Sequence, residues 1–283
     1  MITTSSVARD PAATLVDRGR AGPYRVLTIR APDIVGHAQP GQFVSVGVEA
    51  ARTLLRRPFA IAGVDTQRHT LDIVVAVVGQ GSAWLASHQA SGVLDVVGPL
   101  GRGFVLPAVP TRCVLVGGGY GTAALEWLGQ RLSRDGHDIE LLSGAATASA
   151  LYPVSRLASD APGEGERERA GGRGFNLIET TEDGSRGSTG LVTAALAERL
   201  DRRPAAKVFA CGPMAMLAAV ADLARRYGCD CQVAVEELMG CSVGVCMTCV
   251  VPTTQGYVRA CIEGPVLNAE RIDWRSVRGR HRD

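Results

Sequence analysis

The sequence lacks a large charge excess, a long apolar run and an export pattern. Its 283 residues carry a formal net charge of only +2, so charge indicates neither a nucleic-acid binder nor an acidic tail. No segment approaches the ~18 consecutive apolar residues of a membrane span. Residues 1–15 lack a basic stretch followed by an apolar run. We therefore expect a cytoplasmic protein with no membrane and no nucleic-acid partner.

Two kinds of hydrophobic pattern divide the chain. Up to residue 108, short β-rich runs are separated by Gly, Pro and Asp, which predicts a small antiparallel barrel. From residue 113 on, apolar strands alternate with glycine turns and amphipathic helices, which predicts a doubly wound parallel sheet. The expected class is therefore β + α/β, with a barrel over 1–108, an α/β domain over 109–228 and a cysteine-containing segment over 229–283.

The expected elements follow from the same patterns. We expect strands at 24–29, 42–48, 59–64, 71–78, 93–97, 113–116, 139–142, 176–178, 207–210 and 232–235. Helices are expected at 122–133, 151–158, 191–200 and 214–227. The charged, Gly-rich stretch 162–174 predicts a mobile surface loop, and the chain ends in a polar, Arg-rich tail.

Four cysteines near the C-terminus have the spacing of a plant-type [2Fe-2S] cluster. Cys241, Cys246 and Cys249 form C-x4-C-x2-C, and Cys261 follows after a hairpin-like stretch. Two irons bridged by sulfide need four thiolates, and a short glycine-containing loop lets three of them converge without crowding. The spacing therefore indicates one-electron transfer.

Disulfides and a structural zinc site are the alternatives for these cysteines. The first gap lies at the edge of the usual zinc spacing, and a closing C-x2-C pair is missing. Eight cysteines without an export signal fit a reducing compartment, which favours the cluster over disulfides. We expect the other four cysteines not to be ligands: Cys113, Cys211, Cys229 and Cys231.

Two short motifs in the barrel region together resemble a flavin site. Residues 56–61 read RRPFAI where a strand begins, and residues 79–82 read GQGS where a helix begins. An arginine can hold a diphosphate through a forked, charge-assisted contact, and glycine lets backbone N–H groups approach phosphate oxygens. Each motif alone is better explained by an edge-strand Arg-Pro or a turn glycine.

Two glycine turns in the α/β region indicate a dinucleotide site. Residues 116–122 read VGGGYGT between a strand and a helix, and residues 211–214 read CGPM at a later strand end. Doubly wound sheets bind ligands at this edge. A glycine turn used only for helix packing, and a buried apolar Cys211, are the alternatives.

In this order the motifs resemble the electron-transfer subunits of bacterial dihydroorotate dehydrogenase, which are ferredoxin-reductase-like flavoproteins with a C-terminal [2Fe-2S] loop. The resemblance covers nearly the whole chain. It rests on residues 40–43 (PGQF), 57–58 (RP), 98–101 (GPLG), 116–121 (VGGGYG), 183–187 (DGSRG), 211–214 (CGPM) and 239–241 (MGC).

The resemblance implies a set of binding residues. FAD would contact Arg57, Pro58, Phe59, Ala60, Val74, Val75, Ala76, Gly81 and Ser82. The glycine turns would hold NAD through Gly117, Gly118, Gly119, Gly121, Cys211, Gly212, Pro213 and Met214. The cluster ligands would be Cys241, Cys246, Cys249 and Cys261, and no acid-base residue is needed for catalysis.

Three departures from the family pattern stand out. Ala60 replaces the hydroxyl residue usual in the flavin motif, and Ser242 stands where the cluster loop usually has glycine, which would strain the chain at a positive φ. The prolines often seen after the nicotinamide loop are absent at 122–124. After the second α/β strand, residues 143–146 offer no arginine for a 2′-phosphate, which favours NAD over NADP. An arginine within 164–173 could reverse that preference.

The implied function is a relay between NAD(H), FAD and a [2Fe-2S] cluster. Its partner would be an FMN-containing catalytic subunit that converts dihydroorotate to orotate in pyrimidine biosynthesis, in a heterotetramer of two plus two. Val243, Val245 and Met247 would suit the docking surface. The alternatives are the reductase of an oxygenase, the small subunit of an NAD-ferredoxin oxidoreductase or, in another class, a zinc-binding structural partner.

Overall fold

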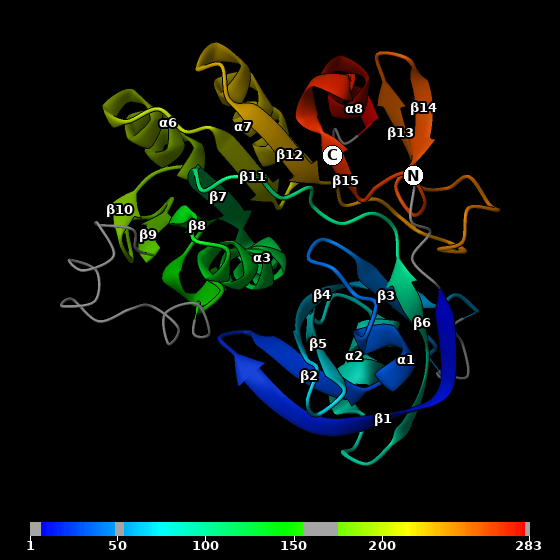
Figure 1. Ribbon diagram of the computed structural model, residues 1–283. Coiled ribbons are helices and arrows are strands. Elements are labelled where there is room, and N and C mark those ends of the chain that lie inside the picture. The colour runs from blue at the N-terminus through cyan, green and yellow to red at the C-terminus, as the bar shows by residue number, and fades with distance from the viewer. Residues whose placement is uncertain (1–6, 49–53, 155–174, 281–283) are drawn as a thin grey trace.

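A computed structural model describes residues 7–48, 54–154 and 175–280 of the chain. A β-barrel occupies one end of the molecule and a helix-covered sheet the other, with the C-terminal hairpin beside both (Figure 1). This arrangement confirms the expected β + α/β class. Within the described residues, no helix is both long and apolar enough to cross a bilayer.

The barrel closes from six antiparallel strands in the order β1-β2-β5-β4-β3-β6. Alternating residues fill its interior, as a pleated strand with one buried face requires. In β5, for example, Leu71, Ile73 and Val75 are fully buried. The elements are β1 (Ala8–Ala21), β2 (Tyr24–Arg30), α1 (Pro32–Val35), β3 (Phe43–Val46), β4 (Arg57–Asp65), β5 (Thr70–Val75), α2 (Gln80–Ser87) and β6 (Val93–Leu100).

The second body is a mostly parallel sheet of seven strands in the order β10-β9-β8-β7-β11-β12-β15. The chain starts in the middle of this sheet and winds outward in both directions, so the carboxyl ends of β7 and β11 meet at a switch point. Its strands are β7 (Arg112–Gly118), β8 (Asp138–Ala145), β9 (Phe175–Thr181), β10 (Ser188–Thr189), β11 (Lys207–Cys211), β12 (Asp230–Ala234) and β15 (Val266–Asn268).

Helices cover both faces of this sheet because its strands are apolar on both sides. Cys113 and Leu115 of β7 pack in the cluster that contains α3 (Thr122–Arg134). Val114 and Val116 pack in the cluster that contains α6 (Val192–Arg202) and α7 (Met214–Arg226). Helix α3 lies between the sheet and the barrel (Figure 1), and its Trp127 joins the barrel core. The two bodies therefore share an apolar interface.

The C-terminal segment is built into the fold. Strand β12 extends the main sheet, and β15 pairs with it antiparallel. Between them, β13 (Val250–Thr253) and β14 (Gly256–Arg259) form the expected hairpin. The 3-10 turn η3 (Ala269–Arg271) and helix α8 (Trp274–Arg280) close the chain against β13 and α7. The cysteine loop between β12 and β13 is thus anchored at both ends.

The structure has elements that were not expected, including the short α1, β10 and β15, and three further differences have a clear physical reason. Strand β1 was not expected, because only Ala13 and Leu15 along it are buried and the other residues are exposed or half-buried. The helix expected at 151–158 is wrong for its described part: a short 3-10 turn, η2 (Ala148–Ala150), precedes extended backbone. Pro153 disfavours a helical residue before it, and residues 155–158, like the loop expected at 162–174, lie outside the described part. The Arg-rich tail contains α8, whose Val277 is buried.

Candidate electron-transfer site

The four cysteines of the C-terminal segment come together as two pairs. The backbone N–H of Cys246 lies 3.3 Å from the Sγ atom of Cys241, and the thiols of these two residues interact. Cys249 and Cys261 form the second interacting pair, and both are buried. Among the described residues, no three His, Cys, Asp or Glu side chains are gathered around a single metal position. Two thiols for each of two irons is the donor set that a [2Fe-2S] cluster requires.

The cysteine loop directs polar hydrogens at its sulfur atoms. The N–H groups of Val245 and Cys246 both donate to Cys241 Sγ at 3.3 Å. The Thr248 hydroxyl donates to Cys246 Sγ at 3.1 Å, and this contact is the main reason that the pKa of Cys246 falls to about 6. Hydrogen bonds of this kind stabilise thiolates and tune the potential of a cluster bound to them. The residues present therefore fit a cluster.

Residues with a positive φ, in the left-handed backbone region, shape the cysteine loop. Gly244 has φ +81° and a Cβ atom there would meet Ile262 Cγ1 at 2.7 Å, so only glycine fits. Ser242 has φ 63°, so this serine adopts the left-handed region that favours glycine. Arg259, held by Glu263 at 2.6 Å, donates to the carbonyl oxygen of Gly244 at 3.1 Å. The loop is thereby fixed to the hairpin that carries Cys261.

The other cysteines lie in apolar surroundings. Cys113, Cys229 and Cys231 are buried in the two core clusters of the sheet, and burial raises the pKa of Cys113 and of Cys231 to about 12. Each of the eight cysteines carries a free thiol. Burial alone does not set these three apart, because the expected ligands Cys249 and Cys261 lie in the same core cluster as Cys229 and Cys231. That the three are small core residues and not ligands stays a prediction from the cysteine spacing.

The two expected flavin motifs meet in space. A Cβ atom on Gly81 would lie 2.8 Å from Nε of Arg57, so the guanidinium of β4 lies directly over the first turn of α2. Arg57 Nη1 donates to the carbonyl oxygen of Leu55 at 2.7 Å, a neutral partner. The neighbouring Arg56, in contrast, is held by Asp95 at 2.7 Å. A cation beside the N–H groups of a helix start suits a diphosphate.

Some expected flavin residues can contribute only backbone. Val75 is fully buried in the barrel core, whereas Val74 and Ala76 face the interface with the sheet. The Ser82 hydroxyl accepts from the N–H groups of Val78 and Gly79, both at 3.0 Å, and donates to the carbonyl oxygen of Gly79. It therefore caps the turn before α2.

The two glycine turns lie against each other at the carboxyl edge of the sheet. Gly117 of β7 is paired with Cys211 of β11. A Cβ atom on Gly121 would meet the carbonyl oxygen of Cys211 at 2.6 Å, so glycine is required for this approach. Cys211 packs in the same apolar cluster as Val74 and Ala76. Tyr120, inside the first turn, packs against Tyr24 of the barrel strand β2, so the structure brings the expected nucleotide turns against the barrel.

Within this edge, some expected nucleotide residues point inward. Met214, the first residue of α7, has its side chain buried in the core. Burial raises the pKa of Cys211 to about 12, which keeps its thiol neutral. At the neighbouring strand end, the N–H groups of Glu182 and Asp183 donate to the carbonyl oxygens of Ala145 and Ala146 at 3.1 and 3.2 Å. Two acidic residues therefore stand beside the end of β8.

Sequence reasoning missed an aromatic group where the first glycine turn contacts the barrel. The Tyr120 ring packs edge-on against Tyr24, with centroids 6.0 Å apart. Its hydroxyl donates to Glu236, and burial is the main cause that raises the Tyr120 pKa. Tyr152 lies on the other side of Tyr24 and donates to Glu126 at 3.0 Å. The only signal in the sequence was a tyrosine inside the glycine turn.

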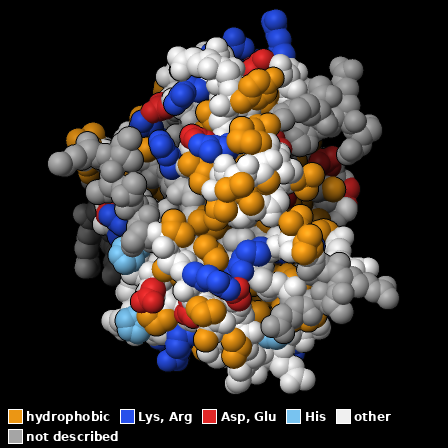
Figure 2. Space-filling view, turned by 90° about the vertical axis from the view of Figure 1, so that its right-hand side faces the viewer, with side chains coloured by type: hydrophobic (Ala, Val, Ile, Leu, Met, Phe, Trp, Pro, Cys, Tyr) orange, Lys and Arg blue, Asp and Glu red, His pale blue; other side chains and the backbone are white. Residues whose placement is uncertain are grey.

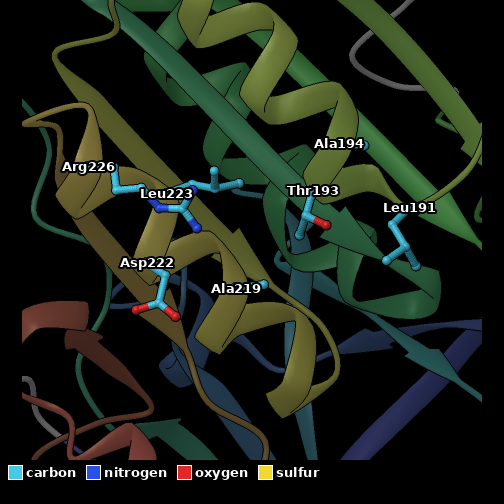
Figure 3. Close-up of a pocket in the computed structure, with 7 residues that line it drawn as sticks. All are labelled: Leu191, Thr193, Ala194, Ala219, Asp222, Leu223 and Arg226. Atoms are coloured by element: carbon cyan, nitrogen blue, oxygen red, sulfur yellow. The ribbon is translucent and has the colours of Figure 1, made fainter.

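A hollow of about 410 Å³ lies elsewhere, between the start of α6 and the second half of α7 (Figure 3). Leu191, Thr193 and Ala194 line it on one side, and Ala219 and Arg226 on the other. It shares no residue with the flavin, nucleotide or cysteine sites, so it takes no part in the site described above.

Known proteins resemble the chain over most of its length. Residues 236–273 match the family described as the iron-sulfur cluster binding domain of dihydroorotate dehydrogenase B. The electron transfer subunit of dihydroorotate dehydrogenase B (NAD(+)) from Bacillus caldolyticus is 37% identical over 240 residues, which are 83% of this chain and 86% of that protein.

Two solved structures share the fold. The structure described as an NADH-dependent reduced ferredoxin-NADP oxidoreductase, studied for flavin-based electron bifurcation, superposes with a TM-score of 0.78 and 27% identity over 95% of this chain and 92% of that one. A ferredoxin NADP+ reductase from Neisseria gonorrhoeae superposes with a TM-score of 0.61 and 16% identity over 78% of this chain and 92% of that one, which shows the fold alone.

The cysteine loop, the barrel and the glycine turns occur together in one fold, and the matching sequences extend over more than four-fifths of the chain. The chain belongs to the family of electron transfer subunits of dihydroorotate dehydrogenase B, and it is an oxidoreductase subunit of ferredoxin-reductase-like fold with an iron-sulfur-binding domain.

Proposed function

We propose that the chain transfers electrons between NAD(H), FAD and a [2Fe-2S] cluster. One observation supports this proposal: the barrel contacts both of the other two expected sites. On one side, Tyr24 of β2 packs edge-on against Tyr120 of the first glycine turn, with ring centroids 6.0 Å apart. On the other, Ser45 of β3 is hydrogen-bonded to Ser242 of the cysteine loop. Nicotinamide, flavin and cluster would therefore be bound in the order that electrons need.

The residues have distinct roles in this proposal. Arg57 and the start of α2 would bind the FAD diphosphate, and Val74 and Ala76 would lie against the flavin. Bound FAD accepts two electrons together and releases them one at a time, which joins a two-electron carrier to a one-electron carrier. The protein positions these groups, excludes water between them and sets the cluster potential through its N–H and O–H donors. No acid-base residue is needed.

We propose NAD rather than NADP as the nucleotide. Residues 143–146 carry no cation, and the backbone of Glu182 and Asp183 is hydrogen-bonded to this strand end. Carboxylates beside the ribose would disfavour a 2′-phosphate. The arginines that could reverse this preference, in 164–173, lie outside the described residues.

The partner in this proposal is the FMN-containing catalytic subunit, which would convert dihydroorotate to orotate in a heterotetramer of two plus two. The cysteine loop offers an apolar docking surface of exposed residues: Leu238, Val243, Val245 and Met247. Figure 2 looks onto the side of the molecule that carries this loop and shows hydrophobic side chains gathered over its middle. Exposed apolar side chains beside the cluster suit an interface through which electrons pass.

Reconstitution tests the proposal. The purified chain should contain flavin and [2Fe-2S] absorption bands and reduce artificial dyes with NADH, but should not oxidise dihydroorotate alone. Adding the FMN subunit should produce NAD-dependent dihydroorotate oxidation. Val245→Glu should weaken that coupling and spare dye reduction, because it places a charge in the docking surface. Leu191→Glu, at the start of α6 on the opposite side, is the matched control. A colourless chain would refute the proposal.

A second candidate is the flavin-containing small subunit of an NADH-dependent ferredoxin oxidoreductase. The superposition on such an enzyme over 95% of this chain favours it. The two candidates differ in their partner: this one requires ferredoxin reduction or oxidation by a complex that lacks dihydroorotate activity.

A further inference from the structure

Ser242 adopts a backbone conformation that serine rarely accepts. Its φ is 63°, and the residue is only 1% exposed. A side chain with a Cβ atom is strained in this region, and such strain persists only where the surroundings hold the residue in place. Ser242 directly follows Cys241, so whatever holds it also holds the first cysteine of the loop.

The barrel supplies the contact that holds Ser242. The Ser45 hydroxyl of β3 donates to the Ser242 hydroxyl at 3.2 Å, across 197 positions of sequence. Ser45 is also 1% exposed. A hydrogen bond between two buried hydroxyls is costly to break, because water cannot replace the lost partner.

Ser45 is itself held in place beside β4, the strand that carries Arg57. It is paired with Pro58 of β4, the residue after Arg57. Its carbonyl oxygen accepts from Arg56 Nη2 at 2.9 Å, and Arg56 is held in turn by Asp95 at 2.7 Å. A continuous set of contacts therefore runs from β4 through Ser45 and Ser242 to Cys241.

We propose that this pair, the Ser45–Ser242 latch, fixes the cysteine loop on the barrel and so sets the position of the cluster relative to the flavin. Ser45 and Ser242 are positioning residues: they act through the loop and need not touch either group. The inference rests on the proposed function, and it adds a specific determinant of the flavin-to-cluster step.

Substitutions separate the latch from simple stability. Ser45→Ala removes the hydrogen bond alone, and Ser242→Ala removes it while keeping the backbone strain. Ser242→Gly removes both the bond and the strain, so its folding stability should stay near wild type. Ser91→Gly relieves the same kind of strain at an exposed barrel position, where φ is 69°, and is the matched control.

Three measurements on the purified holoprotein report on the latch: the rate of cluster loss to a chelator, the rate of cluster reduction after flavin photoreduction, and the flavin-to-cluster distance distribution by pulsed electron paramagnetic resonance. Ser45→Ala and Ser242→Ala should each speed cluster loss by about three- to tenfold. The double variant should be no worse than either single variant, because both remove one bond. Ser242→Gly should broaden the distance distribution and slow cluster reduction at near-wild-type stability.

The outcomes distinguish the inference from the proposed function. Additive effects of the two serine changes, or an unchanged distance distribution in Ser242→Gly, would overturn the latch while flavin and cluster signals remain in the wild type. Absence of those signals from the wild type would instead overturn the proposed function. Ser91→Gly should match wild type in all three measurements, and a change there would show that strain relief alone moves them.

Discussion

Cysteine thiols have different surroundings and different pKa values in two regions of this molecule, the cysteine loop and the sheet. In the cysteine loop, Cys241 and Cys246 receive hydrogen bonds from N–H and O–H donors, and Cys246 is exposed. In the sheet, Cys113 and Cys231 lie among apolar side chains. The Cys246 pKa is lowered to about 6, and the pKa values of the two core thiols are raised to about 12.

The difference teaches that surroundings, rather than residue type, set the charge of a thiol in this chain. A raised pKa does not by itself mark a core thiol, because burial also raises the pKa of the expected ligand Cys261 to about 12. A thiolate binds metal, and it forms where donors surround the sulfur. A buried apolar site favours the neutral thiol, because desolvation penalises the charge. The loop carries Cys241, Cys246 and Cys249, whereas Cys261 follows the hairpin and is buried beside Cys249. The spacing along the chain, and not the pKa alone, distinguishes the four expected ligands from the other cysteines.

Exchange of one cysteine in each region should give the largest contrast. Cys246→Ser should abolish the cluster absorption bands and leave FAD bound, because the flavin residues lie on other elements. Cys231→Ser should keep both cofactors and only lower the melting temperature, because a hydroxyl replaces a buried thiol. Visible spectra and iron analysis of the two variants check this. A normal cluster in Cys246→Ser would contradict the ligand assignment.

Alkylation rates should also differ greatly, because Cys113 and Cys231 should react far more slowly in the folded chain than an ordinary thiol does. With pKa values near 12 rather than 9, the thiolate fraction of Cys113 and Cys231 at pH 8 falls by about a thousandfold. Iodoacetamide should therefore leave both residues unmodified in the folded holoprotein and label them in guanidinium, as peptide mass spectrometry can show. Rapid labelling in the folded state would contradict their burial.

The same two thiols predict a loss of stability at high pH. Their pKa values are raised on folding, so between about pH 9 and pH 12 the folded chain binds more protons than the unfolded chain. Stability from these thiols is present below pH 9 and declines as the pH rises through this window. Unfolding in denaturant at a series of pH values measures the slope. The Cys113→Ala, Cys231→Ala variant should show a shallower slope than wild type.

Two neighbouring arginines allow a parallel test in the barrel. Arg57→Ala should weaken flavin retention by about one to two decades, since a lost charge-assisted hydrogen bond costs roughly 1.5–3 kcal/mol. Arg56→Ala should mainly destabilise the barrel, because Arg56 is held by Asp95 and Ser45. Flavin titration of the apoproteins separates the two effects. Full retention by Arg57→Ala would count against its role.

The smallest expected effect is that of shortening a core thiol. Cys113→Ala should lower the free energy of unfolding by about 1–2 kcal/mol, because it removes buried contacts without adding a polar group. Both cofactor spectra should stay unchanged. Chemical denaturation measures the difference, and a lost cluster band would show that Cys113 belongs to the site after all.

Much of the fold could be predicted because local pattern and tertiary environment agree. A strand that is covered on both faces of its sheet has a continuous apolar run, and residues 113–116 show such a run. Strand β1 was not predicted because most of its residues are exposed or half-buried and its apolar residues do not alternate regularly. Pairing with β2 and β6 determines its position. Helix α8 escaped for a similar reason, since its buried Val277 stands among arginines.

Some features of the candidate site could likewise be predicted from the sequence, and others could not. The cysteine spacing and the glycine turns can be read from sequence, because metal ligands and close backbone approaches restrict residue type strongly. The contact of Ser45 with Ser242 and that of Tyr120 with Glu236 could not be read, because each joins segments more than one hundred residues apart. A hydroxyl or a carboxylate has many partners available, and its identity alone does not select one.

The sequence by itself determined the order of the strands and helices, the spacing of the ligands and the turns that only glycine permits, since these depend on neighbours along the chain. Only the tertiary structure decided that Arg56 and not Arg57 is paired with an acidic residue, and that Val74 of β5 is less buried than Val75. It also decided that Ser45 contacts the cysteine loop. These depend on how the barrel, sheet and hairpin pack, because burial and hydrogen-bond partners come from segments distant in sequence.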